Sequence, residues 1–421
     1  MRLASSWDWE PGDRVVLEST KCSEEHEWQE EFYASPDGER LACAVKLSDF
    51  EYGVWVNGEV WESRFDRVWY PRFGPDGRLT VLVNAEMDWT VATEDQPWDE
   101  TYAYVWDTRF SDDGSRVAVA VQQDGKYGMA VNGELWPTLY DNANNFALSM
   151  DGSQSAAAVQ VESMGQADIN KFMAGVFSLA VDGKAWDKTF MNVWTPVFSP
   201  DSRRVAAQAR LNHYEYSLAV DGGLWPETYQ MIWEPVFNAS TGQIAAPVRL
   251  GGKWGMALDG LMAWKPKFLQ CWQPRFSRDG KRLAAIVATD YGAFTVAIDA
   301  KPWAWTLPVL DDLVLSDDGS SAAARGKDGD EKWTILQNGA PWHHRYDMVF
   351  TPAISPDGAF VAAKVEKKGR YRIAVNGHEL EQTFETAWDP TFSPDGTKVL
   401  VRGLDQGKFL RMVVPVEKYR Y

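Results

Sequence analysis

The chain has 421 residues, with 60 Asp and Glu against 42 Lys and Arg, which gives a formal net charge of −18 at pH 7. This acidic balance argues against nucleic acid as a partner, because binding a phosphate backbone requires gathered Lys and Arg. The 22 Trp residues are the anomaly of the composition, and a bias of this size indicates an architecture that uses Trp repeatedly.

The N-terminal segment, residues 1–29, precedes a repeated pattern. It lacks the apolar run of a secretory signal. No stretch elsewhere approaches the roughly 18 to 20 apolar residues that a bilayer requires. We therefore expect no direct membrane insertion and a cytoplasmic location. Residues 13–19, DRVVLES, read as a strand that has no partner in the first repeat.

From about residue 30 to 421 the chain repeats itself roughly every 40 residues. Each copy carries a Ser-Pro-Asp-Gly-like turn, first at Ser35 and last at Ser393, and seven copies then carry an Asn-Gly or Asp-Gly turn between apolar runs. The second turn type is a strong hairpin signal, because both of its central residues must accept a positive φ. One copy is longer than the others, with an insertion between Val161 and Lys171. Four short strands per copy is the pattern of a propeller blade; we label them A to D.

Aromatic residues occupy fixed positions in the copies, such as Trp106 five residues before the first turn and Trp136 closing strand D. Proline recurs two residues after the first aromatic, as in Pro196, which excludes a helix interior and suits an edge strand. We therefore predict an all-β chain, a single domain spanning residues 1–421. It is a β-propeller of about ten WD-repeat-like four-stranded blades, with most Trp packed between blades.

Closure of the ring is the open step of this prediction. The last copy supplies only strands A, B and C before the chain ends. We expect residues 13–19 to add its missing D strand. Ten blades exceed the usual four to eight, so a division into two smaller rings remains an alternative.

Motifs for catalysis and for cofactor binding are missing from the sequence. There is no GxxxxGK[ST], GxGxxG, HExxH, GxSxG or CxxCH. We expect no catalytic residue, no metal site and no cofactor. Cys22, Cys43 and Cys271 are scattered and form no disulfide framework, and His343-His344 point to opposite faces of a strand. The chain is therefore predicted not to be an enzyme.

One face of the predicted ring differs from the other. The A–B and C–D turns form an acidic face, whereas the B–C and D–A connections collect basic and apolar residues on the opposite face. Exposed apolar side chains within a polar rim commonly mark a protein interface. We predict a partner-docking surface on this second face that includes Tyr104, Met191, Met231, Met348, Lys367, Lys368 and Arg370.

The Phe-Ser-Pro-Asp(-Gly) turns at residues 198–201 and 392–396, followed by VAA or VLV, resemble the WD-repeat-like blades of TolB-type propellers. More narrowly, the ten Trp-rich copies with their PDGxxxAA and AV(N/D)GxxW phrases resemble the TmcD family. Its members are subunits of the Tmc transmembrane redox complex of sulfate-reducing bacteria.

This resemblance implies a non-catalytic, cofactor-free scaffold subunit, peripheral to the inner membrane through its partners. Those partners would be an iron-sulfur protein related to heterodisulfide reductase, a cytochrome b-type membrane subunit and a tetrahaem cytochrome. The complex links periplasmic hydrogen oxidation to cytoplasmic sulfate reduction. The alternative is a ligand- or glycan-binding or hydrolytic propeller with a small-molecule site in its central channel.

Overall fold

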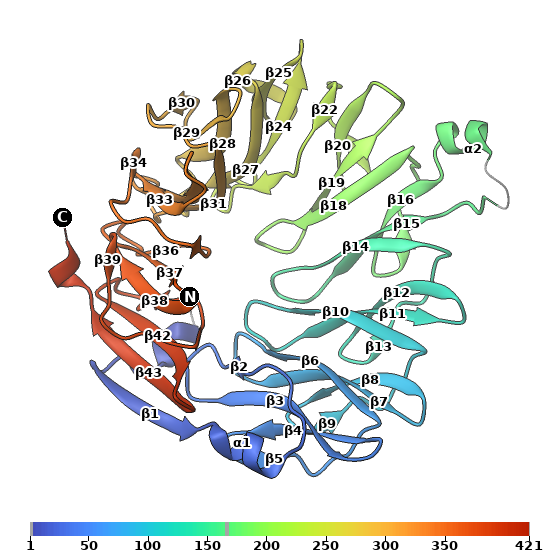
Figure 1. Cartoon of the computed structure of the whole chain (residues 1–421). Helices are drawn as coiled ribbons and strands as arrows, with labels where there is room; N and C mark the ends of the chain where they lie inside the picture. Colours follow the sequence, from blue (N-terminus) through green and yellow to red (C-terminus); the bar gives the residue numbers. More distant parts are fainter. Residues whose placement is uncertain (1–2, 165–167, 421) are drawn as a thin grey trace.

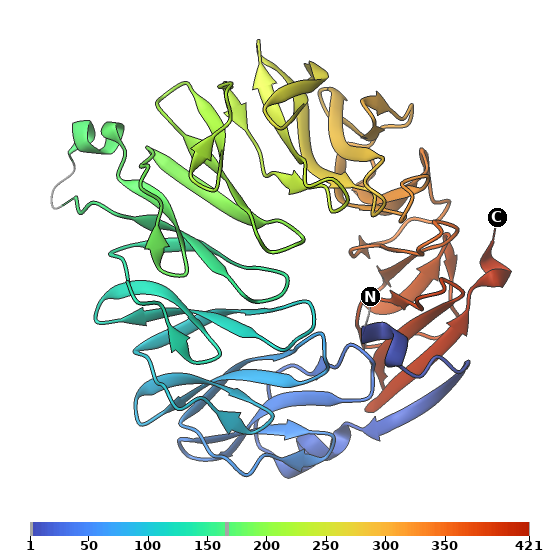
Figure 2. The same ribbon diagram turned by 180° about the vertical axis from the view of Figure 1, so that it is seen from behind.

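Ten antiparallel sheets, one for each repeat, surround a common axis in the computed structural model, which describes residues 3–164 and 168–420 (Figure 1). All ten belong to one ring, as the view from behind also shows (Figure 2). The first strand of each blade faces the centre and the fourth lies at the rim. The predicted ten-bladed β-propeller is confirmed, and the alternative of two rings is wrong.

The first five blades follow the order A-B-C-D. Blade 1 contains β2 (Tyr33–Ala34), β3 (Leu41–Ser48), β4 (Glu51–Val56) and β5 (Glu59–Val60), and blade 2 contains β6 (Arg67–Phe73), β7 (Leu79–Ala85), β8 (Asp88–Thr93) and β9 (Gln96–Pro97). Blade 3 contains β10 (Tyr104–Phe110), β11 (Val117–Gln123), β12 (Lys126–Val131) and β13 (Glu134–Leu135). Blade 4 contains β14 (Ala143–Leu148), β15 (Ser155–Gln160), β16 (Phe177–Val181) and β17 (Lys184–Ala185), and blade 5 contains β18 (Asn192–Phe198), β19 (Val205–Arg210), β20 (Tyr216–Val220) and β21 (Gly223–Leu224).

In three of the last five blades strand A is broken into two short pieces. Blade 6 contains β22 (Met231–Ile232), β23 (Val236–Phe237), β24 (Ile244–Leu250), β25 (Lys253–Leu258) and β26 (Leu261–Phe268), and blade 7 contains β27 (Gln270–Phe276), β28 (Leu283–Asp290), β29 (Ala293–Ile298) and β30 (Lys301–Pro302). Blade 8 contains β31 (Val309–Leu315), β32 (Ala322–Lys327), β33 (Trp333–Gln337) and β34 (Ala340–Pro341). Blade 9 contains β35 (Met348–Val349), β36 (Ala353–Ile354), β37 (Val361–Lys367), β38 (Arg370–Val375) and β39 (His378–Glu379), and blade 10 contains β40 (Thr386–Ala387), β41 (Thr391–Phe392), β42 (Lys398–Asp405), β43 (Lys408–Pro415) and β1 (Gly12–Glu18).

Helical segments are short and lie outside the blades. They are α1 (Thr20–Glu25), α2 (Ile169–Ala174) and the 3-10 turns Leu3–Ser6 and Glu417–Tyr419. α2 belongs to the predicted insertion, of which residues 165–167 lie outside the described residues. In the part of the chain that the structure describes, no helix has the length and apolar character needed to cross a membrane.

The ring is closed by β1, as predicted, with bounds shifted by one residue. It pairs antiparallel with β43, from Gly12 opposite Val413 to Glu18 opposite Lys408. Blade 10 thus contains both ends of the chain. Buried Arg402 ties this blade to blade 1, because its guanidinium donates to the Ser35 carbonyl (2.9 Å) and to the Asp389 carbonyl (2.7 Å).

In eight of the ten blades the A–B turn is built by one Ser and one Asp. In blade 7 the Ser277 hydroxyl donates to Asp279 Oδ1 (2.7 Å), which also accepts the Lys281 backbone N–H (3.1 Å). The Ser277 hydroxyl in turn accepts the Arg282 backbone N–H (3.0 Å). Because these donors favour the charged form, the Ser277 hydrogen bond first and then the backbone N–H lower the pKa of Asp279 to about 2. The turn aspartates are structural, as the sequence indicated.

Neighbouring blades share their cores, which accounts for most of the Trp and Tyr. Trp136 and Trp342, which close strand D, are 5% and 3% exposed. Tyr229, four residues after another such Trp, is buried, and its hydroxyl donates to the Gly260 carbonyl of the next blade (2.7 Å). Small Ala residues on strand B, such as Ala207, leave space for these rings. A blade cannot bury both faces of its sheet alone, so the aromatic rings between blades hold the ring together.

Candidate docking face

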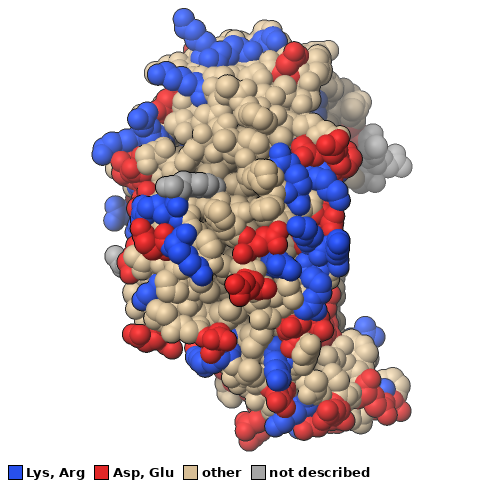
Figure 3. All heavy atoms as spheres, turned by 60° about the vertical axis from the view of Figure 1, so that its left-hand side comes forward, with Lys and Arg blue, Asp and Glu red and all other residues tan. Residues whose placement is uncertain are grey.

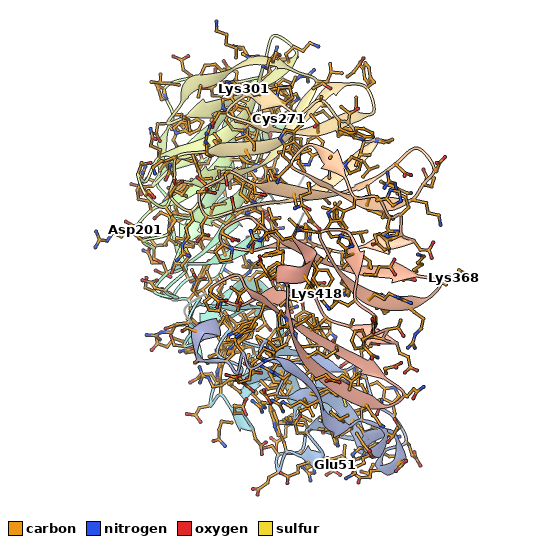
Figure 4. The ribbon with its side chains drawn as sticks, turned by 90° about the vertical axis from the view of Figure 1, so that its left-hand side faces the viewer. Glu51, Asp201, Cys271, Lys301, Lys368 and Lys418 are labelled. Carbon is orange, nitrogen blue, oxygen red and sulfur yellow. The ribbon has the colours of Figure 1, made fainter. Side chains whose placement is uncertain are left out.

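The two sides of the ring are formed by different turns. In the side view of Figure 4, Asp201, in an A–B turn, projects on one side, and Lys368, in a B–C turn, projects on the other. We call the side formed by the B–C turns and the connections between blades the B–C face. Its B–C turns comprise residues 49–50, 86–87, 124–125, 161–176, 211–215, 251–252, 291–292, 328–332, 368–369 and 406–407.

Large apolar side chains stand at the tips of several B–C turns. Phe50 and Met87 are each 86% exposed, Tyr214 is 82% exposed and Tyr291 is 93% exposed. Ile169, on α2 in the longer B–C connection of blade 4, is 61% exposed. Single exposed apolar residues are ordinary, but here they recur at equivalent turns of one face. None of these tip residues was among those predicted from the sequence for this face.

The backbone at two of these tips disfavours the side chains it carries. Phe50 has φ 66° and Met87 has φ 75°, both in the left-handed region that bulky residues rarely occupy. The equivalent turn of blade 3 is Asp124-Gly125, with φ 52° and 75°, which matches the 53° and 75° of Glu86-Met87. Asn, Asp and Gly suit such turns. Since these exposed rings and thioethers are kept at a conformational cost, they support a functional role for the tips.

Aromatic rings continue from the tips toward the inner strands of blades 2 and 3. Trp69 is 40% exposed and Tyr104 is 37% exposed. Tyr104 joins the two blades, because its ring lies 5.5 Å from Trp89 and 5.8 Å from Trp106, centroid to centroid. Trp106 in turn packs edge-on against Tyr127 (6.2 Å). Tyr104 therefore lies on the B–C face, within a continuous aromatic cluster.

The three methionines predicted for this face lie deeper than expected. Met191 is 1% exposed and therefore cannot reach a partner; it lies directly before β18, and its backbone N–H donates to the Arg210 carbonyl (3.0 Å). Met231 is partly buried against the core between blades 6 and 7, and Met348 is also partly buried. We remove Met191 from the candidate surface. A position in a connection between blades does not reveal whether its side chain turns inward.

The predicted basic residues lie on the B–C face of blade 9, but their charges are largely offset. Lys367 contacts Glu379 (3.4 Å), and Arg370 pairs with Asp405 and with Glu385 (3.6 Å). Lys368 is exposed at the turn tip. In Figure 3 a column of Lys and Arg follows one edge of the molecule, beside a broad area without charged side chains. Exposed pairs of this kind contribute little to stability, about 0 to 1 kcal/mol each.

A second feature is a groove of about 490 Å³ on the inner strands of blades 5 to 7, which we call the aromatic groove. Its walls include Trp194, Trp233 and Trp272, the strand A aromatics of three successive blades, and Glu234. Trp233 is 44% exposed, and its other side is stacked on Trp254 at 5.6 Å. Strand A is interrupted here between β22 and β23, which leaves these side chains open to solvent.

Nowhere in residues 3–164 and 168–420 do three His, Cys, Asp or Glu side chains gather as metal ligands. Burial raises the pKa of the Cys271 thiol to about 12, so this cysteine is a core residue, as predicted. The rings of His343 and His344 lie 5.4 Å apart, centroid to centroid.

Comparisons with known proteins find similar solved structures but do not assign the chain to a family. No protein-family model and no curated protein sequence matches the chain. The chain is similar to a crystal structure of the eukaryotic initiation factor, with 13% identity over 89% of each chain and a TM-score of 0.45. It is also similar to the β-propeller domain of Myceliophteria thermophila Cps50 (Swd1), with 11% identity and a TM-score of 0.29. This similarity covers 65% of this chain and 96% of that chain. The ten four-stranded blades themselves define the class: the protein is a ten-bladed β-propeller.

Proposed function

We propose that the protein is a non-catalytic scaffold that binds another protein through its B–C face. The observation that carries this proposal is the set of apolar tips, of which Phe50 and Met87 sit on left-handed backbone while 86% exposed. Apolar side chains on loops held by a rigid ring can enter pockets of a partner without reorganising the scaffold, which limits the entropic cost of binding. Lys368, exposed at a turn tip of the same face, would help to set the orientation of the partner.

The particular complex is proposed from the resemblance of the repeats to the TmcD family. The partner on the B–C face is then a subunit of a membrane-associated electron-transfer complex. It would be the iron-sulfur protein related to heterodisulfide reductase, the cytochrome b-type subunit or the tetrahaem cytochrome. The propeller would hold no cofactor and would carry no electrons. Its role is to position a redox subunit in a complex that links hydrogen oxidation to sulfate reduction.

A pull-down from native cells in mild detergent tests both levels of the proposal. The tagged protein should co-elute with iron-sulfur and haem subunits that are identified by mass spectrometry and by the visible spectrum of the eluate. The triple variant Phe50→Asn, Met87→Gly, Tyr291→Asn should lose these subunits. Met150→Asn is the matched control, because Met150 is 42% exposed in an A–B turn of the opposite face.

Two results would count against the proposal. Retention of the redox subunits by the triple variant would place the interface elsewhere on the ring. Co-elution of an identified partner that carries neither haem nor iron-sulfur clusters would be consistent with a scaffold function. It would overturn the proposal that the protein belongs to an electron-transfer complex.

The aromatic groove favours a second candidate, the binding of a small ligand such as a glycan. Exposed Trp233 offers one ring face for stacking, and Glu234 supplies a charged group in the same groove. Saturation-transfer NMR with oligosaccharides would detect such binding, and Trp233→Leu should abolish the signal. Trp305→Leu, at another exposed Trp (52%), should leave it unchanged. If Trp233→Leu and Trp305→Leu give equal saturation-transfer signals, the aromatic groove is excluded as the glycan-binding site.

A further inference from the structure

Two of the three cysteines meet where the N-terminal segment joins the ring. Cys22 lies on α1 and Cys43 on β3, and their Sγ atoms are 3.4 Å apart. Both side chains are fully buried, whereas Cys271 lies in a different core cluster, between blades 6 and 7. Since the sulfur atoms of a disulfide are about 2.05 Å apart, an approach of about 1.4 Å would join this pair. Positions 22 and 43 gave no sign of this contact in the sequence.

The segment that carries Cys22 connects the last blade with the first. β1 completes blade 10, and at its end the Ser19 backbone N–H donates to the Gly407 carbonyl in the β42–β43 turn (2.7 Å). α1 then reaches blade 1, where Cys22 packs in one core cluster with residues of both blades. This cluster contains Cys22, Leu41, Cys43, Val45, Trp55, Leu404 and Phe409. The cysteine pair therefore sits at the seam that closes the ring.

We propose that Cys22 and Cys43 form a reversible disulfide that fastens the closing strand. The oxidant is a low-molecular-weight disulfide such as oxidised glutathione. One protein thiolate attacks a sulfur of this disulfide, forms a mixed disulfide and releases one small thiol. The second protein thiolate then attacks the protein sulfur of the mixed disulfide and releases the other small thiol. The protein loses two protons and two electrons, and the oxidant becomes two thiols.

The closed seam protects the pair from this reaction. The hydrogen bond with Cys22 and burial raise the pKa of the Cys43 thiol, which keeps it protonated and unreactive. α1 has only six residues, Cys22 is its one buried residue, and its N-cap Ser19 makes no side-chain capping bond. A helix this short gains little stability of its own, so local opening of α1 exposes the thiols while the blades stay folded.

The disulfide shortens the tether of β1. In the reduced protein, the chain between Glu18 and the first strand of blade 1 at Tyr33 holds β1 near its site. In the oxidised protein, the tether runs only from Glu18 to Cys22. Effective concentration falls roughly as the −3/2 power of tether length, so β1 should open roughly 7-fold less often in the oxidised protein. This inference is independent of the docking proposal.

The test uses the full-length protein, reduced and then treated with oxidised glutathione in urea below the unfolding transition. Peptide mapping should find a Cys22–Cys43 cross-link and a free Cys271 thiol. Hydrogen exchange of residues 12–18 should slow by roughly 5- to 10-fold and recover after dithiothreitol. Cys271→Ser, the matched control, should behave like the wild type. Cys22→Ser and Cys43→Ser should each abolish both effects, and Cys22→Ser suffices if Cys43→Ser does not fold.

Several outcomes would overturn the inference. Two free thiols at saturating oxidant would overturn the proposed disulfide. A link from Cys22 or Cys43 to Cys271 or to a second chain would overturn it as well. A cross-link that leaves the exchange of residues 12–18 unchanged would refute its role in fastening the closing strand.

Discussion

Replacing Met87 by glycine should make the protein more stable, although it removes a large apolar side chain. Met87 is 86% exposed at φ 75° in the B–C turn of blade 2. Blade 3 provides the reference, because Gly125 has the same φ of 75° at the equivalent position, and a Cβ built there meets no atom within 4 Å. Met87→Gly and Gly125→Met therefore exchange the same two residues in matched backbone settings.

The size of the effect follows from two opposing terms. An L-residue in the left-handed region costs roughly 1 to 2 kcal/mol. Glycine recovers this strain but loses roughly 0.5 to 1 kcal/mol through its greater freedom in the unfolded chain. We expect Met87→Gly to raise the free energy of unfolding by about 0.5 to 1 kcal/mol, and Gly125→Met to lower it by a similar amount. In a chain of this size the change in Tm should be about 0.5 to 1 °C.

Thermal and urea unfolding of the two variants and the wild type would measure these changes. The reasoning predicts opposite signs for Met87→Gly and Gly125→Met, together with loss of partner capture in the first. If Met87→Gly lowers stability, then Met87 makes contacts that stabilise the fold, and its exposed, strained position no longer argues for docking.

Two further predictions concern the scaffold. The pKa of Asp279 is lowered to about 2 in the folded protein, below the unfolded value of about 3.9. The stability it contributes is therefore present above pH about 4 and is lost as the pH falls toward 2. Asp279→Asn should lower Tm at pH 7 but not at pH about 2, and an equal loss at both would contradict this. Arg402→Met should cost about 3 kcal/mol in urea unfolding, because the carbonyl of buried Ser35 and the carbonyl of Asp389 both lose a charged donor. Arg14→Met, at an exposed ion pair, should cost less than about 1 kcal/mol, and similar costs for the two would refute the seam argument.

The blades and their closure could be predicted from the sequence because turn chemistry and strand pattern repeat within each copy. Ser277 and Asp279 make the same local bonds in every suitable copy, so their role is independent of distant residues. The need for β1 followed from counting, because the last copy lacked its fourth strand.

Side-chain direction and long-range contact could not be predicted in this way. Met191 and Tyr104 occupy similar connections, yet one turns into the core and the other to the surface. The approach of Cys22 to Cys43 depends on α1, whose short length leaves no periodic pattern. The apolar tips did leave a signal, since Met87 stands where the equivalent turn has glycine. A large apolar residue at a turn position where other copies have glycine is therefore a sequence pattern that indicates an exposed apolar tip.

The pairing of β1 with β43 also has a consequence for how the protein is made. Leu17 and Phe409 are opposite each other in one sheet but about 390 residues apart in the chain. At roughly 5 to 20 residues per second, the ribosome needs roughly 20 to 80 s to deliver the second partner after the first. During that interval the nascent blades form an open arc, and β1 has no edge to join. Such long-range closure is slow, so closure of the ring waits until the residues of β43 have been synthesised.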